Sequence, residues 1–239
     1  MNEKPKIGIL RWEEGYVPEG LLQLEKLKGN STNPKSYPFE MNMRHVPGAN
    51  TDSIILHPNE EVLNHMIDIS KDMVQDGVCA IATSCGFNAI FQEKLKETLD
   101  VPILSSALLQ IPLIRNIIGK EKSIGVITAN SRALTEEHFR QCGVEDYKKI
   151  YVMGMENSTE WNTIFEDPDN SFDMNLVTEE VISTAVKGVN DCKNMGAIVL
   201  ECTDLPPFAE AIREKTGLPV FDFISMMTWI GVSLGAYSL

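Results

Sequence analysis

The chain has 239 residues, of which 43% are hydrophobic and 23% are charged, so it carries enough apolar material to fold around a core. Its 34 acidic and 21 basic residues give a net charge of −13. This charge argues against a nucleic-acid or anionic-membrane partner, because phosphate groups are bound by clustered lysine and arginine side chains. A small anionic substrate is compatible with it, since one pocket can be positive on an acidic protein.

The sequence carries no sign of export, membrane insertion or cofactor binding. Residues 1–6 lead into a strand-like run without an apolar leader, and the apolar tail at residues 224–239 is too short to span a bilayer. We therefore expect a cytoplasmic protein. The five cysteines are odd in number and form no CxxC pair, which argues against a disulfide framework. No glycine-rich nucleotide motif occurs and the four histidines lack ligand spacing, so we expect neither a cofactor nor a metal.

Strand-like and helix-like segments alternate along the chain in two successive series. The first series has helical periodicity at residues 62–74 and strand-like apolar runs at residues 6–10, 39–46, 78–83 and 101–104. The second series has helical periodicity at residues 177–189 and strand-like runs at residues 123–128, 149–153, 197–201 and 218–221. Further helices are expected at residues 107–118 and 225–234. The third strand of each series is apolar nearly throughout, which is typical of a parallel strand covered on both faces.

The two series are related by a constant displacement of 117 positions. It places residues 7–10 on residues 124–127, Cys85 on Cys202 and Pro102 on Pro219. One displacement that serves the start, middle and end of both halves indicates an internal repeat.

Two such series predict an α/β fold of two similar parallel-sheet domains related by internal pseudo-symmetry, because alternating strands and helices form βαβ units. We assign residues 1–105 and 219–239 to the first domain and residues 106–218 to the second. Ligands of such folds bind outside the carboxyl ends of the strands, so the active site is expected in a cleft between the domains. The polar segments 13–36 and 157–173 are expected to be loops that cover this cleft.

Cys85 and Cys202 lie at matching places, where the third strand of each half turns into a helix. Free backbone N–H groups and the helix dipole at such a turn stabilise a thiolate. The amides of Ser84, Cys85 and Gly86 suit a carboxylate ligand, and Gly86 lets it approach the backbone closely. Packing explains one buried cysteine, but not two at equivalent positions of a repeated fold. The cysteines without a counterpart are assigned to packing: Cys79, Cys142 and Cys192.

Two thiols on opposite sides of a cleft suit proton transfer at a stereocentre. One thiolate removes an α-proton while the opposite thiol delivers a proton to the other face, which is general acid–base catalysis. The anion that forms beside a carboxylate needs hydrogen-bond donors at its oxygens, and the two helix N-termini supply them. This chemistry requires no metal or cofactor.

The chain resembles the aspartate/glutamate racemase superfamily, a cofactor-independent group that includes hydantoin racemases, maleate isomerases and arylmalonate decarboxylases. The resemblance covers essentially the whole chain. It rests on Ile-Gly-Ile in the first strand, Ala-Thr-Ser-Cys ending at Cys85, Gly-Val-Ile-Thr ending at Thr128, and Glu-Cys-Thr-Asp-Leu-Pro starting at Glu201. It implies that Cys85 and Cys202 are the acid/base pair at a domain interface. It also implies that several residues lie near the substrate carboxylates: Ser84, Gly86, Thr128, Asn130 and Thr203.

Three positions depart from the glutamate racemase pattern. Gly86-Phe87 stands where Asn-Thr usually follows the first cysteine, Asp204 replaces a histidine, and Arg11-Trp12 replaces Asp-Ser after the opening strand. Glutamate is therefore not the expected substrate. Arg11 is placed to hold a second carboxylate, or it forms a surface ion pair with Glu13 or Glu14. Asp204 is a further substrate-binding candidate, and capping of the next helix is its alternative role.

The sequence thus predicts a cofactor-independent racemase or epimerase of an amino acid or related small carboxylic acid, with a homodimer as the expected assembly. Two retained cysteines argue against an arylmalonate-type decarboxylase, in which one thiol suffices. A cis–trans isomerase of a small dicarboxylate, with one nucleophilic cysteine, stays open. So do a non-catalytic two-lobed binding protein and a redox protein with a Cys85–Cys202 disulfide, which requires Cα atoms within roughly 7 Å.

Overall fold

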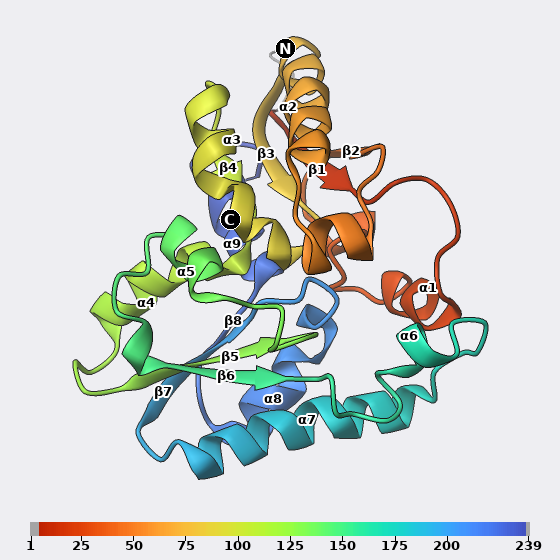
Figure 1. Cartoon of the computed structure of the whole chain (residues 1–239). Helices are drawn as coiled ribbons and strands as arrows, with labels where there is room; N and C mark the ends of the chain where they lie inside the picture. Colours follow the sequence, from red (N-terminus) through yellow and green to blue (C-terminus); the bar gives the residue numbers. More distant parts are fainter. Residues whose placement is uncertain (1–4, 238–239) are drawn as a thin grey trace.

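The computed structural model describes residues 5–237 as two α/β lobes, each built on a four-stranded parallel sheet (Figure 1). The first sheet has the order β2-β1-β3-β4 and the second the order β6-β5-β7-β8. The strands are β1 (Lys6–Arg11), β2 (Met41–His45), β3 (Val78–Thr83), β4 (Ile103–Leu104), β5 (Ser123–Thr128), β6 (Ile150–Gly154), β7 (Met195–Leu200) and β8 (Val220–Phe221). The predicted fold of two similar parallel-sheet domains is confirmed.

Helices flank the sheets, and short helical turns connect many of the elements. The α-helices are α1 (Glu19–Glu25), α2 (Glu60–Gln75), α3 (Gln92–Thr98), α4 (Ile111–Ile117), α5 (Glu136–Gln141), α6 (Thr163–Glu166), α7 (Met174–Asp191), α8 (Ala209–Thr216) and α9 (Phe223–Ser233). The short helices are η1 (Pro34–Ser36), the π-helix η2 (Thr51–Leu56), η3 (Gly86–Phe91), η4 (Ala107–Gln110), η5 (Tyr147–Lys149) and η6 (Pro206–Phe208). Within residues 5–237, none of these helices is both long and apolar enough to cross a membrane.

The central strands of the two sheets pair in the same register. Gly8 of β1 lies opposite Ile81 of β3, and Gly125 of β5 lies opposite Ile198 of β7. These two pairs are related by the displacement of 117 positions found along the chain. Both pairings also shift register at their first residue. The two lobes therefore share strand order, strand direction and pairing.

Helices α2 and α7 form where the apolar periodicity predicts them. Each turns one face to the core, with Met66 of α2 and Val181 of α7 almost fully buried. A side-chain cap starts each helix: Asn59 accepts from the backbone N–H of α2, and Asp173 does the same for α7. Packing of the apolar face and the cap together define these two helices.

The chain crosses between the lobes close to its C-terminal end. β8 pairs with β7 and belongs to the second sheet, whereas α9 packs Phe223 and Met227 against Ile9 of the first sheet. The boundary expected between residues 218 and 219 is therefore corrected, because the crossover falls at Asp222, the N-cap of α9. An apolar strand of two residues fits either sheet, so its sequence does not show which sheet it joins.

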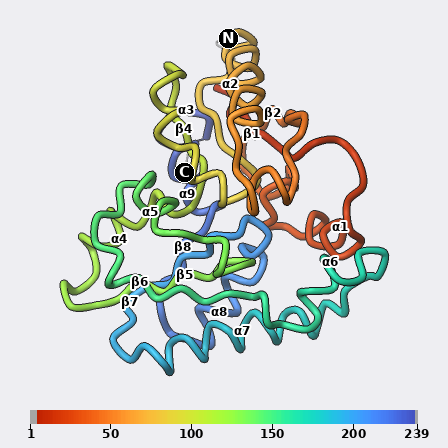
Figure 2. The backbone as a smooth tube through the Cα atoms, viewed as in Figure 1, coloured from red at the N-terminus to blue at the C-terminus, as the bar shows by residue number. Residues whose placement is uncertain are grey.

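The two polar segments expected as loops contain short helices. α1 and η1 lie within residues 13–36, and α6 lies within residues 157–173. Helix α1 lies beside α6 (Figures 1 and 2). The Tyr16 hydroxyl donates to Asp169 Oδ1 at 2.6 Å, and the Gln23 side chain bonds the backbone of Phe172. A segment of the first lobe is thus tied to a segment of the second.

Aromatic packing makes a further link between the lobes. The ring of Phe87 in η3 packs edge to face against the ring of His138 on α5, with the ring centroids 5.7 Å apart. Burial lowers the pKa of His138 to about 4, so this ring is neutral at physiological pH. A neutral imidazole packs in this apolar setting without the cost of a buried charge.

The buried central strands predict the largest stability effects. Ile81→Ala is expected to lower the free energy of unfolding by about 2–5 kcal/mol, because Ile81 is fully buried and its loss leaves a cavity. Ile198→Ala, the equivalent change in the second lobe, should act similarly. Ile117→Ala is the control, since Ile117 is 62% exposed and should cost less than about 0.5 kcal/mol. Urea unfolding measures all three, and equal effects of Ile81→Ala and Ile117→Ala would contradict this core.

Candidate active site

A cavity of about 640 Å³ lies between the lobes, beyond the carboxyl ends of the central strands. Thr128 and Asn130 lie outside its lining. Thr128 donates to Glu201 instead, and Asn130 accepts from the backbone of its own loop. The other residues that the sequence selected all line the cavity: Arg11, Ser84, Cys85, Gly86, Cys202, Thr203 and Asp204.

Cys85 and Cys202 occupy equivalent turns on the cavity wall. Cys85 follows β3, is the N-cap of η3 and is 9% exposed, whereas Cys202 follows β7 and is partly exposed. Both thiols are free. Thr203 Oγ1 donates to the carbonyl oxygen of Ser84 at 2.5 Å, so a hydrogen bond joins the two turns. The tertiary structure therefore brings the two predicted thiols to one site.

Burial raises the pKa of both thiols well above the ordinary cysteine value. Carboxylates raise it further, Glu201 more than Asp204 for Cys85, and Asp204 more than Glu201 for Cys202. The backbone N–H two residues after each thiol, on Phe87 and on Asp204, acts in the opposite direction. The expectation of a stabilised thiolate is therefore corrected. Desolvation outweighs these N–H groups, so both thiols are protonated at neutral pH.

Glu201 is a buried acidic residue whose role the sequence did not predict. Its side chain is fully buried, its Oε2 accepts from Thr128 Oγ1 at 2.7 Å, and its Oε1 has no hydrogen-bond partner within residues 5–237. Burial raises the pKa of this carboxyl to about 7. A Cβ at position 86 would collide with the carbonyl oxygen and Oε1 of Glu201, so only glycine lets the Cys85 turn pack there. The signal available in the sequence was one acidic residue ending an apolar strand.

Asp204 faces Cys202 and does not cap a helix. Leu205 is the N-cap residue of η6 and makes no side-chain cap. Asp204 Oδ1 accepts from Asn30 Nδ2 at 2.7 Å, and Asp204 Oδ2 lies 3.9 Å from Cys202 Sγ. Burial raises the pKa of Asp204 to about 6. The capping role considered for Asp204 is therefore wrong, and its carboxyl is a group of the cavity wall.

Arg11 lines the cavity with its charge already paired. Its Nη2 donates to Glu25 Oε1 at 2.9 Å, and Glu25 also lines the cavity. Glu13 and Glu14 were the expected partners, but Glu13 accepts from Asn50 Nδ2 at 2.8 Å. The ion pair forms with a residue of α1 because that helix folds back over the end of β1.

The rest of the wall combines aromatic and acidic side chains with aliphatic and uncharged polar ones and His45. Its aromatic side chains are Trp12, Tyr16, Phe87, Trp161 and Phe165. Its acidic side chains are Glu13, Glu14, Glu25 and Asp204, whereas Arg11 is the one lysine or arginine in the described lining. The indole N–H of Trp12 is buried beside the Cys85 thiol, whose pKa it lowers. In the same part of the chain, no group of three or more His, Cys, Asp or Glu side chains could hold a metal ion.

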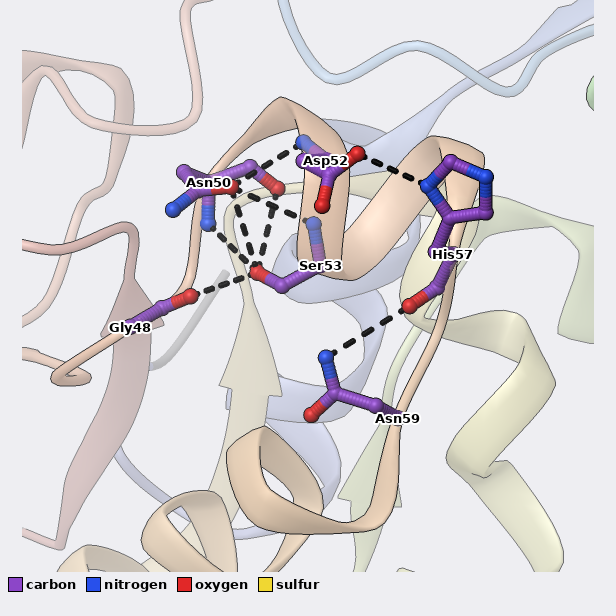
Figure 3. A network of polar contacts seen from close by, with 6 residues as sticks. All are labelled: Gly48, Asn50, Asp52, Ser53, His57 and Asn59. Atoms are coloured by element: carbon purple, nitrogen blue, oxygen red, sulfur yellow. Dashed lines mark hydrogen bonds and ion pairs between the residues drawn. The ribbon is translucent and has the colours of Figure 1, made fainter.

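A capped π-helix shapes the wall next to β2 (Figure 3). Asn50 Oδ1 accepts from the backbone N–H groups of Asp52 and Ser53, and Ser53 Oγ donates to the carbonyl oxygen of Gly48. His57 Nδ1 contacts Asp52 Oδ1 at 2.7 Å at the other end of the turn. Functional sites often carry such π-helical turns. This one places three residues on the cavity wall: Asn50, Thr51 and Ile55.

Comparison with known proteins assigns a family. The model of the Asp/Glu/Hydantoin racemase family matches residues 51–230, so the chain belongs to this family. Allantoin racemase from Klebsiella pneumoniae superposes with a TM-score of 0.65 at 14% identity, over 97% of this chain and 89% of that one. An arylmalonate decarboxylase superposes with a TM-score of 0.60 at 13% identity, over 98% of this chain and 94% of that one. At such identities the likeness shows the fold alone.

Curated relatives that share a higher sequence identity with this chain are named as lyases and not as racemases. Dimethylsulfoniopropionate lyase 7 of Emiliania huxleyi is 27% identical over 232 residues, which are 93% of this chain and 65% of the relative. Dimethylsulfoniopropionate lyase of Durusdinium sp. clade D is 28% identical over 226 residues, 91% of this chain and 71% of the relative. The match covers 58% of the length of dimethylsulfoniopropionate lyase 3 of Emiliania huxleyi. The chain thus spans less than two thirds of several of these relatives.

Glu201 predicts a pH dependence of stability. Its pKa of about 7 in the folded protein exceeds its ordinary value of 4.5, so between these pH values the folded state keeps a proton that the unfolded state has lost. Protonated Glu201 contributes its full stabilisation at pH values below its pKa in the unfolded state. The free energy of unfolding then falls by about 3 kcal/mol as the pH rises through its pKa in the folded state.

Glu201→Gln should remove this contribution, because glutamine does not titrate. Urea unfolding of both proteins at about pH 5 and about pH 8 measures the difference. The same fall in stability in both proteins would contradict the assignment.

Proposed function

We propose that this chain is a cofactor-independent enzyme that removes the α-proton of a small carboxylic acid, with Cys85 and Cys202 as its acid/base groups. The observation that carries the proposal is the presence of two free thiols, in equivalent turns, on the wall of one cavity. Membership of the racemase family supports it. Proton transfer by positioned side chains then supplies the chemistry.

The cavity wall favours a substrate that also carries a positive charge. Cations bind over aromatic faces and beside carboxylates, and this wall offers both, for example Trp12 and Glu14. The one arginine in the described lining, Arg11, is paired with Glu25. A bound cation would offset the carboxylates that raise the pKa of the thiols, so its binding favours the thiolate that the reaction needs.

We propose dimethylsulfoniopropionate as the substrate, because the curated relatives are named for its lysis and match more than nine tenths of this chain. This small carboxylate carries a sulfonium group on its β-carbon. One cysteine thiolate takes the α-proton, and the electron pair of that C–H bond forms a double bond to the β-carbon. The bond from the β-carbon to sulfur breaks, and sulfur keeps its electrons. The products are acrylate, dimethyl sulfide and a proton, which the thiol passes to water.

Racemisation or epimerisation of an amino acid or related acid is the second candidate. It is favoured by the second thiol on the cavity wall, since reprotonation on the opposite face needs a second acid. The first step is the same in both reactions. A substrate without a leaving group on its β-carbon is reprotonated, whereas a sulfonium substrate eliminates.

Proton NMR in D2O separates the candidates. The enzyme is mixed in turn with dimethylsulfoniopropionate, amino acids, hydantoins and unsaturated dicarboxylates. Vinyl signals of acrylate together with dimethyl sulfide support the lyase. Loss of an α-proton signal from an amino acid or hydantoin supports the racemase instead. Conversion between vinyl signals of a dicarboxylate would show a cis–trans isomerase, and saturable binding with unchanged spectra would show a binding protein.

Alanine substitutions test the two thiols separately. Elimination needs one base, so the alanine variant of the cysteine that acts as this base, Cys85→Ala or Cys202→Ala, is expected to lower the rate by at least about 100-fold. Racemisation requires both residues. Cys192→Ala is the control, because Cys192 lies outside the cavity lining and should leave the rate unchanged. Full activity of both single variants with the reactive substrate would overturn the proposed mechanism.

The aromatic wall predicts a binding effect that depends on substrate charge. Trp12→Leu is expected to raise KM for dimethylsulfoniopropionate about fivefold, because a cation over an aromatic face gains about 1 kcal/mol. Trp229→Leu is the matched control, since Trp229 lies on α9 and is 57% exposed. Steady-state kinetics measure both, and an unchanged KM in Trp12→Leu would argue against the cation site.

A further inference from the structure

We propose that Glu201 is a positioning residue that controls how readily the two cavity thiols ionise, through its charge and without contact to substrate. The inference rests on the proposed function only in taking Cys85 and Cys202 as the reactive groups.

The packing places Glu201 between the two cysteine turns. It directly precedes Cys202 in the chain, and its Oε1 and carbonyl oxygen lie against the Cα of Gly86, which directly follows Cys85. The side chain is fully buried and does not line the cavity. Thr128 Oγ1 holds one carboxyl oxygen, and the other has no partner among residues 5–237. A buried carboxyl so close to two thiols acts on them over a low-dielectric path.

The titratable groups around Glu201 come from three elements. Cys85 comes from the turn into η3, Cys142 from the C-cap of α5, and Cys202 and Asp204 from the turn after β7. The charge of Glu201 raises the pKa of all three thiols. These groups therefore share one buried site, in which a second negative charge is costly.

The charge on Glu201 then decides when a thiolate can form. Below its pKa of about 7, Glu201 is neutral and does not oppose ionisation of either thiol. Above this pH, the carboxylate and a thiolate repel each other, so the thiolate population stops rising with pH. Asp204 contributes to the same effect: it raises the pKa of Cys85 less than Glu201 does, and that of Cys202 more. Glu201 is therefore the dominant charged neighbour of Cys85.

Alkylation of the thiols by iodoacetamide tests this inference without any substrate. The rates at Cys85 and Cys202 are followed by mass spectrometry of their peptides, from about pH 6 to about pH 9. In the wild-type protein both rates are expected to level off above about pH 7. In Glu201→Gln the rate at Cys85 should keep rising and at about pH 8.5 exceed the wild-type rate at least threefold. The reason is that lowering a thiol pKa by one unit gains about tenfold in thiolate and loses about threefold in nucleophilicity. The rate at Cys202 should rise less, because Asp204 acts on that thiol more strongly than Glu201.

Two further variants separate charge from structure. Thr128→Val removes the hydrogen bond that lowers the pKa of Glu201, so the levelling should move to higher pH. Glu156→Gln is the matched control, because Glu156 binds Ser131 outside the cavity lining and should leave the profile unchanged. Identical pH profiles in the wild-type protein and Glu201→Gln would overturn the inference. Because no substrate is present, that result would leave the proposed reaction untouched, and inactivity in the NMR experiment would leave this inference untouched.

Discussion

The direct packing of one cysteine turn on the other sets the geometry of this protein. Gly86 lies against Glu201, and Thr203 bonds the carbonyl oxygen of Ser84, so the two turns cannot part without exposing buried polar groups. Each turn ends a central strand of its sheet, β3 or β7. The contact therefore positions both sheets at once, and the cavity with its two thiols forms where their carboxyl ends meet.

Burial gives this site its electrostatic character. Two thiols and two carboxyls, those of Glu201 and Asp204, are crowded together, and desolvation raises the pKa of all four. Such a site disfavours any single negative charge and penalises a second one more strongly. In the proposed reaction, a cationic substrate on the aromatic and acidic wall would relieve this penalty and so couple substrate charge to thiol ionisation.

Proteins that share this fold are named for different reactions. Racemases and decarboxylases share this fold at 13–19% identity, and relatives named as lyases share more of the sequence. A fold hosts several reactions when its site residues change, so the fold alone does not decide between them. Trp12, Phe87 and Asp204, which depart from the glutamate racemase pattern, all line the cavity, so we propose that this wall selects the reaction. An α-carbanion beside a carboxylate can be reprotonated or can expel a β-substituent, depending on what the wall admits.

The sequence by itself determined the fold class, the two matching halves and the pair Cys85 and Cys202, because periodicity, apolar runs and a constant displacement are local or repetitive features that survive without coordinates. Only the tertiary structure showed that Arg11 pairs with Glu25, that Asp204 contacts Cys202, and that Thr128 donates a hydrogen bond to Glu201. It also reversed the expected direction of the thiol pKa. Each of these depends on side chains from distant segments and on exclusion of water, and neither spacing nor residue type along one chain reports which groups are buried together.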